Sequence, residues 1–437
     1  MTCIIILGLL ILNGVVMGAG NVLATVPLDT AFSIAVNPTN QRVYVGGDSH
    51  IYVIDSSTNT LSATLPLTGR FFHMAVNTIT NRFYAVDTLS SPYQLFVLKG
   101  SDNSVITQVE ISGSPNGLAV DSGRNLIYVT NGTTGELDVI DGSSNAITDT
   151  IAIGSAPGPV VVNSITNRIY VAYGLNHIAV VNGNTKDVVD DIAVDNNPVR
   201  MAVNTFTNKI YAVTNYNYVS ELDVVDGDSN TFIHSFLIPA NAASISVNSI
   251  TNRVYIAMVP TSGKGGSVLL VDGTKDTLIG TLPIGKMSLD IGVDSATSRV
   301  YTVTVIGSGT QPSIPTIASS AATASNLQPF ASQGGDSMIV YQDILPVLVA
   351  PVRNFFRMRT PTLTWEGVDW ALGYEIEVDN NSDFKSNEYH SDTLGSSILK
   401  ATTNPLGDGI YYWRVRAKVS STQWGAWSVP QTFQVNA

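Results

Sequence analysis

The side chains best suited to acid-base or charge chemistry recur at one place in a repeated pattern. His73, Arg200 and Asp290 each lie four residues before an Asn or Asp that ends an apolar segment. A histidine, a guanidinium and a carboxylate held together could move protons or bind an anionic group. Such chemistry requires that the elements carrying these three residues meet.

Motifs for other kinds of chemistry are missing from the sequence. It contains no Cys-x-x-Cys-His, Gly-x-Ser-x-Gly or His-Glu-x-x-His. The segments 226–230 and 379–383 superficially resemble calcium loops, but neither has the spaced Glu of an EF-hand. We therefore predict no metal, no cofactor and no assigned catalytic residue.

A repeat with constant internal spacing determines the expected fold. An apolar strand ends in an anchor residue, Asn or Asp, and a second strand opens with a Tyr seven residues later. The seven anchor residues are Asn37, Asn77, Asp121, Asn163, Asn204, Asn248 and Asp294. Successive tyrosines are 40 to 46 residues apart, which is the length of a four-stranded propeller blade. We predict an all-β, seven-bladed β-propeller over residues 21–343.

The two ends of the repeat array predict how the ring closes. The seventh unit has an insertion at 307–335 and lacks a fourth strand, whereas 22–28 resembles a fourth strand with no strands before it. The N-terminal strand should therefore complete the last blade, which removes an exposed sheet edge.

The N-terminus and the composition indicate where the protein works. Residues 1–20 form an apolar run expected to be a signal peptide or an N-terminal anchor, and the single cysteine, Cys3, lies inside it. A formal net charge of −12 opposes nucleic-acid binding. We expect a secreted or cell-surface protein whose one membrane contact would be an uncleaved N-terminal segment.

The segment Tyr128-Val-Thr-Asn131 followed by Gly135-Glu-Leu-Asp-Val-Ile-Asp141 resembles the signature of YVTN β-propeller proteins. That resemblance covers about residues 22–343 and implies a surface-layer or cell-surface role in adhesion or envelope structure. The other units spell Tyr-Val-Gly, Tyr-Ala-Val or Tyr-Ile-Ala instead, which weakens the transfer of a specific activity.

A second domain is expected over 344–437, where the repeat stops and aromatic content rises. Alternating segments place Trp365, Tyr374 and Trp413 in its core, and the pattern resembles a fibronectin type III domain. The stretch 423–428 resembles the Trp-Ser element of that fold, whose aromatic rings could stack on Arg414 or Arg416.

The loops at the channel mouth are the expected ligand-binding face. In a propeller the loops that join fourth to first strands and second to third strands gather there. Aromatic rings near polar groups suit a glycan or a protein, and burial between blades is the alternative for those rings. The candidate ligand-binding residues are Phe71, Phe72, His73, Tyr93, Arg200, Tyr216, Tyr218 and Asp290.

The opposite face should carry a ring of basic residues, each five positions after its anchor. Acidic turn residues before the fourth strands lie on that face too, so we expect ion pairs between blades rather than an anion site. The basic residues are Arg42, Arg82, Arg168, Lys209, Arg253 and Arg299.

Three functions are consistent with these features. The leading one is a non-enzymatic surface or secreted adhesion protein that binds protein or cell-surface glycan. The first alternative is a propeller enzyme of lactonase or lyase type with its site at the channel mouth, and it requires His73, Arg200 and Asp290 to converge. The second alternative is a structural surface-layer subunit.

Overall fold

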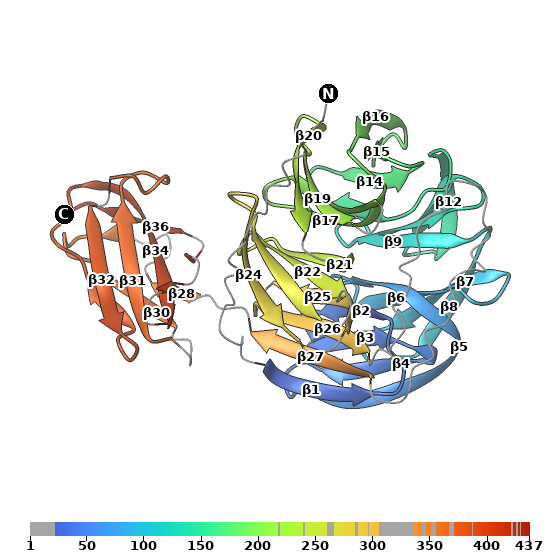
Figure 1. Ribbon diagram of the computed structural model, residues 1–437, viewed down its shortest axis with the longest axis horizontal. Helices are drawn as coiled ribbons and strands as arrows, with labels where there is room; N and C mark the ends of the chain where they lie inside the picture. The colour runs from blue at the N-terminus through green and yellow to red at the C-terminus, as the bar shows by residue number, and fades with distance from the viewer. Residues whose placement is uncertain are drawn as a thin grey trace, which may run out of the picture.

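The computed structural model describes residues 22–216, 219–238, 241–259, 266–284, 287–295, 297–305, 336–342, 347–350, 355–366, 371–386, 388–420, 423–424, 427–428 and 430–437. The expected signal segment 1–20, the insertion 307–335 and the candidate Tyr218 lie outside these residues. Among the described residues, no helix is long and apolar enough to cross a membrane. The chain is nearly all β and its sheets are antiparallel, with one parallel pair (Figure 1).

The first two repeat units share one seven-stranded sheet. Its strands are β2 (Ser33–Asn37), β3 (Arg42–Gly46), β4 (Asp48–Asp55), β5 (Thr60–Asn77), β6 (Arg82–Asp87), β7 (Tyr93–Lys99) and β8 (Val105–Ile111). β5 is 18 residues long and pairs with β4 through its first half and with β6 through its second half. One short 3-10 helix, η1 (Pro38–Asn40), follows β2.

Four further units form separate four-stranded sheets. The third contains β9 (Pro115–Asp121), β10 (Leu126–Asn131), β11 (Glu136–Asp141) and β12 (Ala146–Ala152). The fourth contains β13 (Val160–Asn163), β14 (Arg168–Tyr173), β15 (His177–Asn182) and β16 (Val188–Ala193). The fifth contains β17 (Pro198–Asn204), β18 (Lys209–Tyr216), β19 (Val219–Asp226) and β20 (Thr231–Ile238). The sixth contains β21 (Asn241–Asn248), β22 (Arg253–Val259), β23 (Ser267–Asp272) and β24 (Thr277–Pro283).

The last sheet of the repeat array joins the two ends of that array. It contains β25 (Met287–Asp294), β26 (Arg299–Val305), β27 (Asp336–Gln342) and, at its outer edge, β1 (Val22–Leu28). β1 runs antiparallel to β27, with Val22 opposite Tyr341 and Leu28 opposite Asp336. This is the pairing that the ends of the repeat array predict.

The first strands of the units follow one another around a closed ring. Each contacts the next, and β25 contacts β2. Apolar side chains fill the space between consecutive sheets, as where Val45 and Ile54 pack with Val303 and Val340. The repeated tyrosines are completely buried in these layers. Side chains of a strand point alternately to the two faces of its sheet. The second and third strands are buried on both faces, as in β10 and β11, whereas fourth strands such as β12 and β16 are largely exposed. This arrangement fits a β-propeller (Figure 1).

The C-terminal residues form a separate set of sheets with its own core. One sheet contains β28 (Val347–Ala350), β30 (Thr362–Glu366) and β33 (Lys400–Thr402). The other contains β29 (Phe355–Phe356), β36 (Gln431–Val435), β34 (Gly409–Ser420), β31 (Gly373–Asp379), β32 (Tyr389–Gly395) and β35 (Gln423–Trp424), which pairs with β34. Trp365, Tyr374 and Trp413 are buried in the core, as the sequence predicts.

Candidate functional site

β-Bulges precede the position four residues ahead of the anchor in five of the first strands. At each bulge the register with the second strand shifts by one residue. A bulge sets two residues against one and redirects the side chain that follows. The extra residues are Phe72, Asn116, Val199, Ala243 and Leu289.

His73, Arg200 and Asp290 lie on three of these bulged strands and are electrostatically linked. Burial and, second, the positive charge of Arg200 lower the pKa of His73 to about 3. Burial also lowers the pKa of Arg200, while Asp290 opposes that shift. Each side chain keeps a partly accessible surface, as a group lining the centre of a ring should. The ring therefore brings together the three residues that the sequence singled out.

Asp290 is held by hydrogen bonds from three sheets. Its Oδ2 accepts from the backbone N–H of Ile34 at 2.8 Å, and its Oδ1 accepts from the Ser244 hydroxyl and from its neighbour, the Ile291 N–H. Burial nevertheless raises the pKa of Asp290, against the effect of Ser244, Ile34 and Arg200. Both oxygens are thus engaged in joining the last sheet to its two neighbours.

The candidate aromatic residues divide into buried and half-buried rings. Phe71 is completely buried against Phe96, with ring centroids 5.6 Å apart. Its expected role in ligand binding is therefore wrong, because the ring belongs to the core between the first two units. Phe72 is half-buried beside Phe32 at 5.0 Å, and Tyr93 is half-buried against the apolar cluster between the second and third units.

The last aromatic candidates, Tyr216 and Tyr218, are not placed. The side chain of Tyr216 lies outside the described residues, as does the whole of Tyr218.

On the opposite face, the anchor residues fasten each sheet to the next. The Asn77 side chain accepts from the backbone N–H groups of Ile79 and Thr80 at 3.0 Å and donates to Asn125 Oδ1 at 2.8 Å. Asn125 has a left-handed backbone conformation, φ 55°, which Asn tolerates well. The same donor link joins Asn37 to Asn81, Asn163 to Asn208, Asn204 to Asn252 and Asn248 to Ser298.

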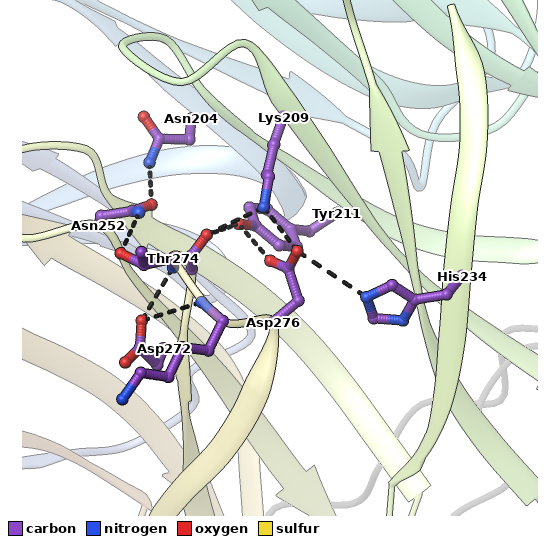
Figure 2. Close-up of polar contacts among 10 residues, drawn as sticks. Asn204, Lys209, Tyr211, His234, Asn252, Asp272, Thr274 and Asp276 are labelled. Carbon is purple, nitrogen blue, oxygen red and sulfur yellow. Dashed lines mark hydrogen bonds and ion pairs between the residues drawn. The ribbon is translucent and has the colours of Figure 1, made fainter. Parts of the chain in front are cut away.

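Three of the six basic residues on this face donate to backbone carbonyls, Lys209 to that of Gly273. Arg82 donates to the Gly142 carbonyl and Arg299 to the Ser56 carbonyl, each in the next unit. Lys209 also makes an ion pair, with Asp276 at 2.5 Å. Tyr211 and His234 reach the same carboxylate, at 3.3 and 3.8 Å (Figure 2). The expectation of ion pairs between units is therefore correct at Lys209. It is wrong at Arg82 and Arg299, and at Arg42, which donates to the Ser62 hydroxyl of its own unit.

A cluster of three carboxylates was missed by the sequence reasoning. One oxygen from each of Asp195, Glu221 and Asp223 lies within 4.8 Å of the others. Burial, followed by the negative charge of Asp195, raises the pKa of Asp223 to about 7. Asp195 follows β16 whereas Glu221 and Asp223 lie on β19, so no sequence motif unites them.

In the C-terminal domain, arginines and aromatic rings alternate. Arg414 lies over Trp427 and Phe384, at 4.6 and 3.9 Å, and Arg416 lies over Trp427 and Trp424, at 4.4 and 5.2 Å. Each arginine also pairs with a glutamate of β31. The stacking that the Trp-Ser element predicts is confirmed.

An all-β chain whose antiparallel sheets follow one another around a centre fits the β-propeller class of protein. No model of a known protein family matches the sequence, and no curated protein matches it. Among solved structures, hydrazine synthase of Kuenenia stuttgartiensis is similar, with 14% identity and a TM-score of 0.47. That match covers 54% of this chain and 76% of the other.

Proposed function

We propose that the chain is a seven-bladed, YVTN-type β-propeller closed by its N-terminal strand and followed by a fibronectin type III-like domain. Seven repeated anchors, seven first strands in a closed ring and the pairing of β1 with β27 support this proposal. The arginine and tryptophan stack supports the second domain.

We further propose that this protein is an exported, non-enzymatic binding protein that recognises an acidic glycan at the loop face. The proposal of binding rather than catalysis rests on the hydrogen bonding of Asp290 and the low pKa of His73 at the centre of the ring. Both oxygens of Asp290 already accept hydrogen bonds, and a histidine with a pKa of about 3 is a weak base at neutral pH. These groups suit recognition better than proton transfer.

Arg200 supplies the affinity for a carboxylate. A guanidinium stays charged and presents five N–H donors in a fixed plane. Among the described residues, its hydrogen-bond partner is the carbonyl of its neighbour Val199, at 2.8 Å, so donors remain for a ligand. The half-buried ring of Phe72, one residue from His73, offers an apolar surface for a sugar face.

The proposal is tested by binding of purified protein to an array of neutral, sulfated and uronic-acid glycans. Arg200→Gln should weaken binding to uronic-acid glycans by about tenfold or more, because a charged hydrogen bond is lost. Arg359→Gln removes an arginine that is 57% exposed in the C-terminal domain and serves as the matched control. A blank array with folded protein, or equal binding by Arg200→Gln, would contradict the proposal, as would binding of protein ligands alone.

The enzyme alternative is favoured by one observation, the proximity of His73 and Asp290 to Arg200. A lactone panel tests it directly. Turnover that His73→Ala abolishes would establish an enzyme in place of a binding protein.

A further inference from the structure

A second polar site lies where the fourth unit passes to the fifth. Asp195 follows β16, and Glu221 and Asp223 lie on β19, with β20 beside β16 (Figure 1). One oxygen of each carboxylate accepts a hydrogen bond: Asp223 from the Asp195 N–H at 3.3 Å, Glu221 from Asn196 at 2.9 Å and Asp195 from Ser235 at 2.8 Å. Such bonds orient carboxylates as the outer shell of a metal site does.

The second oxygen of Asp223 is the independent sign of a missing ligand. Asp223 is completely buried, and its Oδ1 has no hydrogen-bond partner among the described residues. Leaving a buried carboxylate oxygen without a hydrogen-bond partner destabilises the folded protein. No lysine, arginine or histidine among the described residues pairs with any of the three acids. No cationic side chain in the described part of the chain therefore balances their negative charge.

In a second acidic cluster, arginine side chains balance the charge of the carboxylates. Glu375 and Glu377 of the C-terminal domain also lie together with His390, but Arg416 and Arg414 pair with them at 2.6 and 2.5 Å. The arginines therefore take the place that a metal cation could occupy in that cluster. The cluster of Asp195, Glu221 and Asp223 has no such arginine among the described residues.

We propose that Asp195, Glu221 and Asp223 bind a calcium ion that fastens the fourth unit to the fifth. Hard oxygen donors and no nitrogen or sulfur donor favour Ca²⁺ or Mg²⁺ over zinc or copper. Three carboxylates supplied by the protein suit Ca²⁺, which takes about 6–8 oxygen ligands, better than Mg²⁺, which is usually held by one or two carboxylates and keeps several waters. The proposal does not depend on glycan binding.

The chain contains its own control for this site. Glu136-Leu-Asp138 on β11 repeats Glu221-Leu-Asp223 of β19, and Asp138 is likewise buried with one unpartnered oxygen. Ser112, three residues before β9, stands where Asp195 stands three residues before β17. The third unit thus has two carboxylates and lacks the third, so it should not hold the ion.

The experiment is calorimetric titration of EDTA-treated full-length protein with CaCl₂ and, separately, MgCl₂, together with thermal unfolding in each salt. Wild type should bind one Ca²⁺ and unfold at a higher temperature in CaCl₂. Asp195→Asn, at an exposed position, and Glu221→Gln should each weaken Ca²⁺ binding about tenfold or more, whereas Asp138→Asn should not. No Ca²⁺ binding by folded wild type, unchanged titrations of both ligand variants, or equal affinity for MgCl₂ would overturn the proposal.

Discussion

The carboxylate of Asp290 accepts a hydrogen bond from the backbone N–H of Ile34 at 2.8 Å, across 256 residues of sequence. The same carboxylate accepts from Ser244, so one side chain links the last sheet to the sheets on both sides of it. A residue that looks catalytic by type and position is used here to close the ring.

Asp290→Asn should lower the free energy of unfolding by about 2 kcal/mol, because an amide has one acceptor oxygen where Asp290 uses two to accept from Ile34 and Ser244. Urea unfolding followed by circular dichroism measures this loss. Asp383→Asn, at a half-exposed position in the C-terminal domain, should change stability little. Equal stability of Asp290→Asn and wild type would show that these bonds contribute nothing net.

His73 should make stability depend on pH between about 3 and 6.5. Its pKa is about 3 in the folded protein and 6.5 as a free side chain, so in this window the unfolded chain binds a proton that the folded chain does not. Stability contributed here is present above pH 6.5 and lost as the pH falls toward 3. His73→Gln should flatten this part of the stability profile measured by urea unfolding, and an unchanged slope would contradict the assignment.

Asn204→Ala should cost about 1–3 kcal/mol, since it removes the donor to Asn252 and the acceptor of the Phe206 N–H together. The urea midpoint of the repeat domain reports this change. Asn404→Ala, at an exposed position, is the control. A similar midpoint for both variants would mean that the anchor residue has no role in joining sheets.

Trp427→Ala should destabilise the C-terminal domain by about 1–2 kcal/mol, because both Arg414 and Arg416 lose a stacking partner. All five tryptophans lie between 365 and 427, so tryptophan fluorescence follows this domain alone. Met358→Ala changes a side chain that is 62% exposed and provides the comparison. A variant whose fluorescence transition matches wild type would argue that the stack adds no stability.

The repeat predicts much of the fold because one physical requirement recurs in every unit. The anchor must both cap its loop and reach the next sheet, which Asn does at five positions. Where Asp121 replaces it and has no donor, Arg124 pairs with that carboxylate and reaches Ser164 of the next sheet. The expectations for His73, Arg200 and Asp290 also rest on this fixed spacing.

The spacing of the repeat does not predict which neighbouring side chains are buried or which residues meet across units, because these depend on bulges and on packing between units. Phe71 and Phe72 are neighbours in sequence, yet the bulge at Phe72 leaves Phe71 inside the core and Phe72 half-buried. The acids at 195, 221 and 223 come from different strands, so their proximity follows from packing. The same holds for the carbonyls that Arg82 and Arg299 bind in the next unit.

The pairing of β1 with β27 has a consequence for biosynthesis. β1 finds its partner only after residue 342 has been synthesised, so the ring stays open until its last repeat has been made. Contacts of such large sequence separation slow folding and leave strand edges exposed to other chains meanwhile. A nascent chain lacking β27 would therefore need protection from aggregation until its last repeat is complete.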